Sequence, residues 1–323
     1  MNKIRIIGVL LAAVLTATSF TACGKPEQNT SEQTNSTVSA EPQEKTETAE
    51  QIDIYRFEDY ESDEVFDIKR LELKDEYEQK CVSYKFNYLS DGYKIKAYIS
   101  IPLKNIESQK PQQCIMYNRG GNSELGLLED DTVASLCSML GYTVIASQYR
   151  GAGGREGKDQ FGGDDLNDVT KLIDLCENNF SFIDMNDFCV ACASRGGVMT
   201  YPLARRDSRV RRIIAVSAIS DLISGYEERE GMKDLLSEYI GCTPEENPEE
   251  YKKRSAIYWA DEITIPVLII HSTGDQQVSY HQAQELYEKL SEHGNCTFFT
   301  HEDDVHGIHP EDFQNIIEWL RNT

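Results

Sequence analysis

The sequence predicts an α/β fold in which a mostly parallel central sheet carries helices on both faces. The first observation is that short, continuous apolar runs alternate with amphipathic stretches from residue 113 onward. Continuous apolar strands are typical of parallel sheets that are buried on both sides. The second observation is that most of the intervening stretches have the length and periodicity of one crossover helix.

A hairpin of antiparallel strands is predicted ahead of this alternation. The segment "CVSYKFNYLSDGYKIKAYISIP", residues 81–102, holds two alternating runs separated by Ser-Asp-Gly. Alternating apolar and polar residues around a short turn that contains glycine are typical of a hairpin. We therefore expect antiparallel strands at one edge of the sheet.

The remaining elements follow in order along one domain, which we expect to span residues 53–323. Strands are predicted at 113–118, 142–149, 188–193, 211–218, 266–272 and 296–300. Helices are predicted at 123–140, 165–179, 195–206, 279–293 and 310–322. Residues 221–262 exceed the length of one crossover helix. We expect this lid-like insertion to lie at the carboxyl ends of the strands, where it would border a substrate pocket.

Composition narrows the possible partners of the chain. The 323 residues are 40% hydrophobic and 27% charged, as is usual for a soluble globular protein. The formal net charge is −23 at pH 7. A surface of this sign repels a phosphate backbone, so we exclude nucleic acid as a partner.

The first 52 residues predict export and anchoring. Residues 1–22 combine Lys3 and Arg5 with a short apolar run, which is typical of a signal peptide. The following "TACGK" resembles a bacterial lipoprotein signal, in which Cys23 would be lipidated, although Phe20 replaces the usual leucine. An ordinary cleaved signal peptide is the alternative. Residues 23–52 have no apolar period, so we expect a disordered tether outside the cytoplasm.

Eight further cysteines do not predict a disulfide framework. Several of them lie in apolar, strand-like runs, including Cys189 and Cys192. Those two residues form a C-x-x-C motif, but residues three apart on a strand point to opposite faces of the sheet. We therefore expect small, buried apolar side chains rather than a redox or zinc site.

Ser194 is the candidate nucleophile. It follows the predicted strand 188–193 and precedes a predicted helix, and Gly196 and Gly197 come directly after. The nucleophile elbow of an α/β-hydrolase, G-x-S-x-G, needs small residues on both sides because strand and helix approach closely there. Cys192 stands where the first glycine is expected. Cysteine is only modestly larger, so the physical requirement is nearly met.

Two further residues complete the order that an α/β-hydrolase requires, which is serine, then acid, then histidine. Asp275 lies in the loop just beyond the predicted strand 266–272. His306 lies in the loop after the last predicted strand and is followed by Gly307. We prefer His306 to His301 and His309, because those two lie at the ends of the loop.

An oxyanion hole needs two backbone N–H donors aimed at the developing negative charge. We expect one from Arg195, the residue after the nucleophile. The other is expected from the loop after strand 113–118, where Gly120 and Gly121 allow close approach of the backbone.

From about residue 82 onward the chain resembles the catalytic domain of the prolyl oligopeptidase family. The stretches that carry this resemblance are "YLSDGYKIKAYISIP", "YRGAGGREGKDQFGGDDLNDV", "SRGGVMTY", "NPEEYKKRSAIYWADEITIPVLIIHSTGDQQVS" and "DVHGI". The resemblance implies an α/β-hydrolase fold and a triad of Ser194, Asp275 and His306. In that triad the serine attacks a carbonyl, the histidine moves the proton and the aspartate orients the histidine.

The sequence departs from this family in ways that affect the substrate. The chain has no room for the β-propeller that gates substrates in the larger peptidases. Arg119 stands where those peptidases often place a tyrosine in the oxyanion hole, so Arg119 and Asn122 are possible pocket residues. We therefore expect a peptidase, with hydrolysis of esters on the same triad as the alternative. A lipoprotein that binds a ligand without turnover is a further alternative.

Neither a cofactor nor a metal is expected. The glycines of "GAGGREG" lack the strand, helix and ribose-binding acid of a dinucleotide site. Asp164, Asp165 and Asp168 are expected to cap and begin a helix rather than to bind metal. His271 is expected to pack at the end of its strand.

Overall fold

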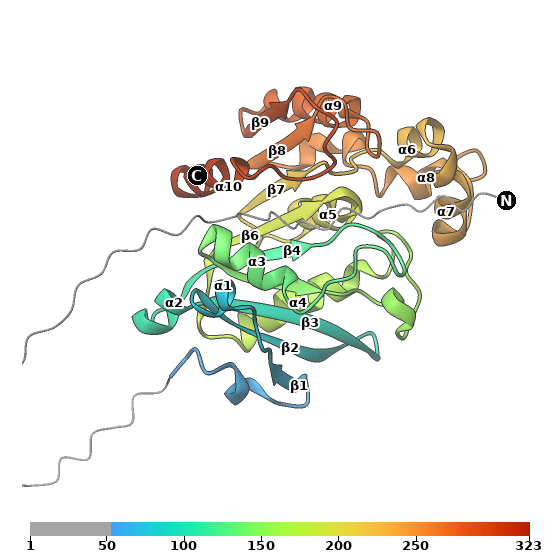
Figure 1. The fold of residues 1–323 in the computed structure, drawn as a ribbon. Coiled ribbons are helices and arrows are strands. Elements are labelled where there is room, and N and C mark those ends of the chain that lie inside the picture. Colours follow the sequence, from blue (N-terminus) through green and yellow to red (C-terminus); the bar gives the residue numbers. More distant parts are fainter. Residues whose placement is uncertain (1–52) are drawn as a thin grey trace, which may run out of the picture. The chain divides into compact units, whose positions relative to one another are not determined.

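The structure is a computed structural model that describes residues 53–323 (Figure 1). The predicted signal peptide, Cys23 and the tether lie outside the described residues. The described strands form one nine-stranded sheet in the order β1-β2-β3-β5-β4-β6-β7-β8-β9. Their bounds are β1 Val65–Arg70, β2 Cys81–Ser90, β3 Tyr93–Pro102, β4 Gln112–Asn118, β5 Thr143–Ser147, β6 Ile183–Ala193, β7 Arg212–Val216, β8 Val267–Ser272 and β9 Cys296–His301.

The predicted hairpin is confirmed at one edge of the sheet. Strands β2 and β3 pair antiparallel from Cys81 opposite Pro102 to Ser90 opposite Tyr93. Asp91 and Gly92 form the turn, with φ angles of 49° and 82°. Positive φ at both central residues matches the right-handed twist of the two strands. Strand β1, which the sequence analysis did not predict, pairs with β2 and extends this antiparallel edge.

Strands β4 to β9 form the parallel part of the sheet, as predicted. Strand β4 has β5 on one side and β6 on the other, so the chain changes direction across the sheet at β4. In open α/β sheets, ligands bind beyond the carboxyl ends of the strands at such a switch point. The loops after β4 and β6 carry Gly120 and Ser194, which places both candidate residues at this point.

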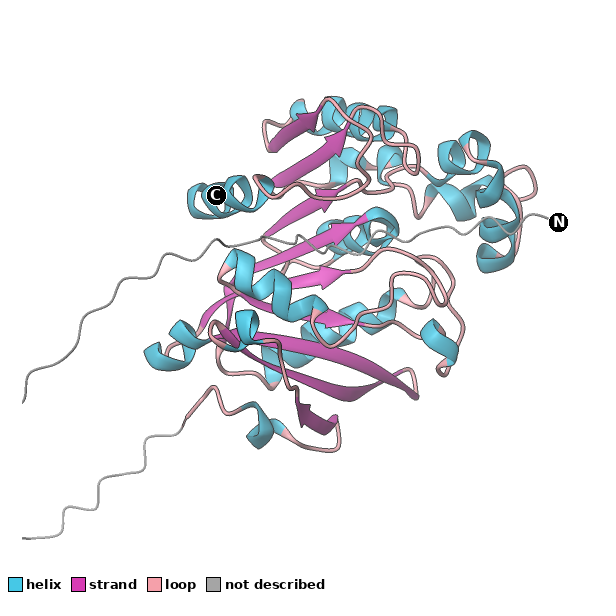
Figure 2. Cartoon of the chain, in the orientation of Figure 1, coloured by secondary structure: helices cyan, strands magenta, loops and turns pink. Residues whose placement is uncertain are grey.

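Helices cover both faces of the sheet (Figure 2). Helices α3 and α10 pack into one apolar cluster on one face, and α4, α5 and α9 pack into the other cluster. The helix bounds are α1 Asp75–Glu78, α2 Leu103–Ser108, α3 Thr132–Leu140, α4 Leu166–Asn178, α5 Gly197–Arg206, α6 Leu222–Glu228, α7 Glu230–Ile240, α8 Pro248–Lys252, α9 Tyr280–Ser291 and α10 Asp312–Asn322.

The prediction of a helix over 123–140 was wrong in its first half, because α3 begins only at Thr132. Residues before it form a loop that is held by tertiary contacts. The backbone N–H and C=O of Leu128 both bond to the side chain of Gln148. Gly126 has φ of 66°, and a Cβ there would lie 2.7 Å from the carbonyl oxygen of Gly120. This contact with the loop after β4 overrides the local helical pattern.

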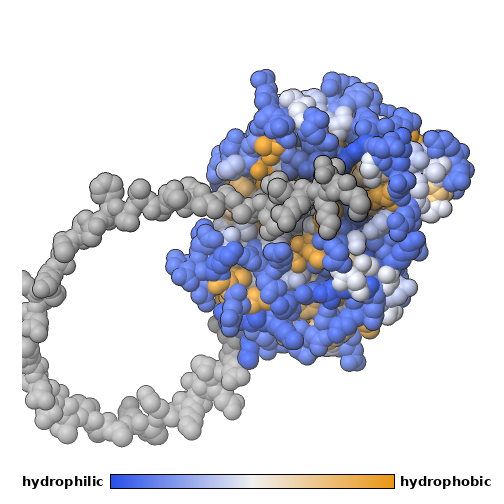
Figure 3. Space-filling view, turned by 45° about the vertical axis from the view of Figure 1, so that its right-hand side comes forward, coloured by the Kyte–Doolittle hydropathy of each residue, from blue (hydrophilic) through white to orange (hydrophobic). Residues whose placement is uncertain are grey.

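The insertion over residues 221–262 is helical and contains α6, α7 and α8 (Figure 1). It lies between β7 and β8 in the chain, beyond their carboxyl ends. No helix within residues 53–323 is both long enough and apolar enough to cross a membrane. The face shown in Figure 3 is largely hydrophilic, with small and separate apolar areas.

Candidate active site

Ser194 lies at a sharp turn between β6 and α5, as predicted. Ala193 is still extended, whereas Ser194 has φ of 52°, in the left-handed region that serine rarely adopts. The surrounding backbone holds this conformation, since the Ser194 carbonyl accepts a hydrogen bond of 3.0 Å from the N–H of Ile219. Strain that the surroundings enforce in this way is typical of a functional site.

The two glycines after Ser194 are required by close packing. A Cβ at Gly196 would lie 2.1 Å from the carbonyl oxygen of Asn118, and one at Gly197 would lie 2.4 Å from that of Ile219. Both distances are far below van der Waals contact. Helix α5 can therefore approach the sheet only with glycine at these two positions, as the nucleophile elbow requires.

Cys192 fills the small position before the nucleophile. Its side chain is buried in the strand, and a Cβ at Gly196 would lie 3.0 Å from the Cys192 Cβ. Burial raises the pKa of the Cys192 thiol to about 12, so the thiol stays protonated at neutral pH. Because the thiolate is the nucleophilic form of cysteine, the position serves packing and not chemistry.

We expect Cys192→Gly to retain catalysis and Cys192→Leu to lose most of it. Glycine at position 192 adds no bulk beside Gly196 and costs about 1 kcal/mol in the free energy of unfolding. The branched leucine would push α5 away and displace both Ser194 and the Arg195 amide. Turnover and labelling by a fluorophosphonate probe measure both effects. An inactive Cys192→Gly variant that is correctly folded would contradict this assignment.

Asp275 and His306 are brought together by the loops after β8 and β9. Nδ1 of His306 lies 2.7 Å from Oδ2 of Asp275. The second carboxylate oxygen accepts hydrogen bonds from the backbone N–H groups of Gln277 and Val278. A carboxylate that accepts from His306 keeps the proton on Nδ1 and leaves Nε2 with its lone pair.

His271 provides a further contact to Asp275 that the sequence analysis did not predict. It is fully buried at the end of β8, and its Nε2 lies 2.9 Å from the carbonyl oxygen of Val278 and 3.2 Å from Asp275 Oδ2. Burial alone would raise the pKa of Asp275, but the hydrogen bonds from His271 and His306 outweigh it. The pKa of Asp275 is therefore held well below its ordinary value, and the carboxylate is ionised.

The loop after β9 is tied to the nucleophile turn through Ser217. Its Oγ accepts a hydrogen bond of 3.1 Å from the backbone N–H of Gly307, next to His306. Two residues further along, Ile219 contacts the Ser194 carbonyl. Ser217 itself has φ of 46°. Within residues 53–323, Ser194 Oγ and His306 form no direct hydrogen bond. The segment after β7 links their two loops instead, through Ser217 and Ile219.

Gly120 lies directly against the nucleophile. A Cβ on Gly120 would lie 3.0 Å from the Cβ of Ser194 and 3.1 Å from the carbonyl oxygen of Ala193. Gly121 has φ of 70°, and a Cβ there would lie 2.2 Å from the carbonyl oxygen of Leu125. Position 121 requires glycine, and a side chain at position 120 would press tightly against the Ser194 turn. The loop therefore brings backbone groups close to Ser194, where an oxyanion hole is expected.

Arg119 supports this loop from beneath. Its side chain is only 1% exposed, and the guanidinium donates to the backbone carbonyls of Gly120, Leu125 and Gln148. The buried guanidinium lies 4.9 Å from the centre of the Tyr149 ring. Arg119 therefore stabilises the loop after β4. Its buried guanidinium does not line a pocket, contrary to the expectation from the sequence. Asn122 is half-buried, and its Nδ2 lies 3.4 Å from the hydroxyl of Tyr239 in α7.

The side chain of Arg195 is also buried and forms two ion pairs. Its Nη2 lies 2.6 Å from Asp159 and 2.8 Å from Asp165, and its Nη1 donates to the carbonyl of Gly121. The guanidinium therefore joins the loop after β4 to the segment before α4. This network holds the turn that carries the Arg195 backbone N–H.

Asp165 and Asp168 lie at the start of α4, as predicted, but their carboxylates do not cap the helix. No side-chain cap bond is present at the start of α4. Asp165 instead pairs with Arg195, and Asp168 pairs with Arg150 at 2.6 Å. Burial raises the pKa of Asp168, partly opposed by Arg150. These carboxylates offset buried guanidinium charges, which residue spacing in the sequence does not reveal.

A cleft of about 560 Å³ opens beside Asp275. The insertion supplies one wall, including Glu228, Arg229 and Met232 from α6, α7 and the residue between them. The loop between β8 and α9 supplies the other wall, including Gln277. The insertion thus borders a cavity at the carboxyl ends of the strands that reaches Asp275 but is lined by neither Ser194 nor His306.

Most of the described cysteines are buried, as the apolar runs around them predict. All eight cysteines within residues 53–323 are free thiols, and six of them are buried. Cys189 and Cys192 belong to the apolar clusters on opposite faces of the sheet. Their C-x-x-C spacing therefore does not bring the two sulfur atoms together.

Comparison with known proteins decides the family. The sequence model described as the prolyl oligopeptidase family matches residues 129–323, which is more than half of the chain. The chain belongs to the prolyl oligopeptidase family. It is a serine hydrolase with the α/β-hydrolase fold of the family's catalytic domain.

Relatives of this family differ in how much of their length the chain spans. The uncharacterized peptidase YtmA of Bacillus subtilis is 29% identical over 247 residues, which cover 74% of this chain and 93% of that protein. Dipeptidyl-peptidase 5 of Aspergillus oryzae is 25% identical over 253 residues, which cover 73% of this chain but only 35% of that protein.

Solved structures show the same fold. The acylaminoacyl peptidase of Pyrococcus horikoshii aligns with a TM-score of 0.65 at 20% identity, over 75% of this chain and 42% of that one. A puromycin hydrolase aligns with a TM-score of 0.60 at 21% identity, over 72% of this chain and 37% of that one. The chain thus spans less than half the length of these two structures.

Proposed function

We propose that this protein cleaves peptide bonds with a catalytic triad of Ser194, Asp275 and His306. The observation that carries the proposal is the 2.7 Å contact between His306 and Asp275, combined with the strained turn that presents Ser194. Both features lie at the carboxyl ends of parallel strands of the same sheet, Ser194 after β6 and the other two residues after β8 and β9. The membership in a family of peptidases favours an amide as the scissile bond.

In the proposed reaction, Ser194 Oγ attacks the carbonyl carbon while its proton passes to Nε2 of His306. Asp275 accepts the Nδ1–H bond and stabilises the imidazolium that forms. The tetrahedral intermediate then collapses, and His306 gives the proton to the leaving amine. Water attacks the resulting acyl-enzyme, with its proton taken by His306, and the carboxylic acid leaves as the proton returns to Ser194.

The proposed oxyanion hole combines the backbone N–H of Arg195 with one from the loop that holds Gly120 and Gly121. Close contact between Gly120 and Ser194 supports this choice. The buried guanidinium groups of Arg119 and Arg195 bond to carbonyls of this loop. They would keep the two donors in position before charge develops, which is how such sites stabilise a transition state.

The experiment that tests this function combines probe labelling with matched substrates. The full chain should react with a fluorophosphonate probe, and aminoacyl and dipeptidyl p-nitroanilides should be hydrolysed with measurable kcat/KM. The p-nitrophenyl esters of the same acyl groups form the second arm. Hydrolysis of the esters alone would identify an esterase instead. Absence of labelling would favour a binding protein that lacks turnover.

We further propose that residues 1–22 direct export and that Cys23 is lipidated, so that residues 23–52 tether the enzyme to the outer side of the cell membrane. The support is the order of a basic start, a short apolar run and a small-residue stretch that ends at Cys23. The polar composition of residues 23–52 supports a spacer rather than a folded segment.

Replacement of Cys23 by serine is expected to release the protein from the membrane fraction, because the thiol is the acylation point. Fractionation and mass spectrometry of the N-terminus in a bacterial host measure this effect. Cys242→Ser, at a half-buried position of the described domain, is the matched control and should remain in the membrane fraction. If Cys23→Ser stays membrane-bound to the same extent, another anchor is responsible.

A further inference from the structure

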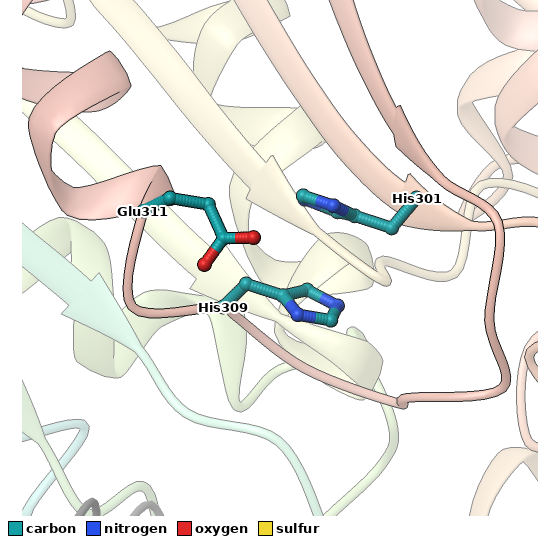
Figure 4. A group of neighbouring side chains, drawn as sticks. All are labelled: His301, His309 and Glu311. Carbon is teal, nitrogen blue, oxygen red and sulfur yellow. The ribbon is translucent and has the colours of Figure 1, made fainter.

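Two histidines and a glutamate gather at the base of the loop that carries His306, outside the proposed triad. His301 is the last residue of β9, and His309 and Glu311 lie just before α10. One ligand atom from each of the three side chains lies within 4.8 Å of the others. Figure 4 shows the two imidazole rings close together, with the Glu311 carboxylate directed toward them.

The two imidazole rings lie against each other. Their ring centres are 3.9 Å apart, with an angle of 32° between the ring planes. Nε2 of His301 lies 2.9 Å from Oδ1 of Asp312, which is fully buried. A histidine that donates one N–H to a carboxylate has the other nitrogen free to bind a metal, and this support is usual around metal sites.

His309 also has a ring nitrogen that is available to a metal. Its Nε2 is buried and has no hydrogen-bond partner. Oδ2 of Asp303 lies 3.3 Å from this nitrogen, within ion-pair distance of a protonated imidazole, but it makes no hydrogen bond to it. The backbone N–H of His309 donates to the second oxygen of Asp312, which fixes the residue in place. A buried ring nitrogen that makes no hydrogen bond is free to accept a ligand.

We propose that His301, His309 and Glu311 bind one divalent transition-metal ion, best matched by Zn²⁺. Two imidazoles and one carboxylate are common zinc ligands, with water in the fourth position. The histidine side chains are 18% and 15% exposed, so water can reach the site. Calcium and magnesium are disfavoured, since they prefer ligand sets made entirely of oxygen.

A metal bound at this site would restrict the loop between β9 and α10, which carries His306. His301 lies at the start of that loop, and His309 and Glu311 lie at its end, with His306 between them. A bound ion would join the two ends and restrict the backbone that positions His306 against Asp275. This consequence for catalysis rests on the proposed function, whereas the binding of zinc does not.

The test is a titration of the chelator-treated full chain with zinc sulfate, followed by isothermal calorimetry and equilibrium dialysis. We expect one equivalent of zinc per chain, no comparable binding of magnesium, and a rise in Tm upon binding. His309→Ala and the exposed Glu311→Gln should each weaken binding at least tenfold. Asp312→Asn should weaken it by roughly tenfold or more through loss of support for His301.

His281→Ala is the matched control, because His281 is an exposed histidine that lies 3.1 Å from Glu285. It should bind zinc as the unmodified chain does. The proposal is overturned if the unmodified chain takes up no zinc, or if Glu311→Gln and His309→Ala bind it normally. Loss of binding in His306→Ala alone would place the metal at the proposed catalytic histidine and would also overturn it.

Turnover with and without zinc provides the second readout. We expect zinc to change kcat of the unmodified chain and to leave that of His309→Ala unaffected. If zinc does not change kcat of the unmodified chain, the proposed effect of the metal on the loop that positions His306 is wrong. If no substrate is hydrolysed at all, the proposed function fails while the calorimetric result stands, so the two failures are distinguishable.

Discussion

Replacing Ser194 with alanine is expected to lower kcat by roughly 10⁴ to 10⁶ while the domain stays folded. The hydroxyl supplies the only atom that forms the acyl-enzyme, so its loss removes the covalent route. The backbone contact between Ser194 and Ile219 uses the main-chain carbonyl and survives the change. Alanine keeps the Cβ against Gly120, so packing at the turn is retained.

Steady-state kinetics on the best substrate, together with fluorophosphonate labelling, measure the effect. Ser208→Ala is the matched control, because Ser208 is exposed and lies between α5 and β7. It should keep both labelling and turnover. Circular dichroism and thermal melting of Ser194→Ala establish that the fold is intact. Near-normal turnover in this variant would rule out Ser194 as the nucleophile.

Asp275→Asn is expected to lower kcat by roughly 10⁴, with little change of the fold. An asparagine amide can donate to His306 as well as accept from it, so it no longer keeps the proton on Nδ1. The neutral amide also stops stabilising the imidazolium that forms when Ser194 loses its proton. Because His271 contacts the same oxygen, the altered side chain would be held in its place.

The control for this variant is Asp304→Asn, the same isosteric change at an exposed position of the loop that carries His306. It should leave kcat within a few-fold of the unmodified value. A comparable loss of kcat in both variants would mean that Asp275 supports the loop generally rather than His306.

Asp275→Asn should also change how stability depends on pH. The pKa of Asp275 is lower in the folded state than its unfolded value of about 4. Ionised Asp275 therefore stabilises the fold above that pH, and this contribution is lost as the pH falls. The free energy of unfolding of Asp275→Asn should fall less steeply on acidification than that of the unmodified chain. Equilibrium denaturation between pH 7 and pH 3 measures the difference.

Local patterns predicted most of the elements because each element satisfies its own chemistry. The hairpin at 81–102 has alternation and a turn that tolerates positive φ, and the parallel strands have continuous apolar runs. The helix expected from residue 123 failed because Gly126 packs against Gly120 and Leu128 bonds to Gln148. Those partners come from other parts of the chain, so a window of sequence cannot contain them.

The residues of the candidate site also fall into two groups, those that the sequence predicts and those that it does not. The turn at Ser194 and the contact between Asp275 and His306 were predictable, because the order of these residues and their positions after strands are sequence properties. His271 and Ser217 were missed as supports, since nothing in their neighbourhood distinguishes them from ordinary buried residues. Arg119 was expected at a pocket, but its guanidinium is buried beneath the glycine loop.

By itself, the sequence determined the α/β class, the hairpin edge, the candidate nucleophile with its acid and base, and the lack of a disulfide pattern. Each of these depends on residue type, period or order along one chain. Only the tertiary structure decided which carboxylates pair with Arg150 and Arg195, which groups orient Asp275, and that His301, His309 and Glu311 meet. Those contacts join residues brought together by the packing of several loops, and a buried charge or an unpartnered nitrogen can be recognised only once its surroundings are in place.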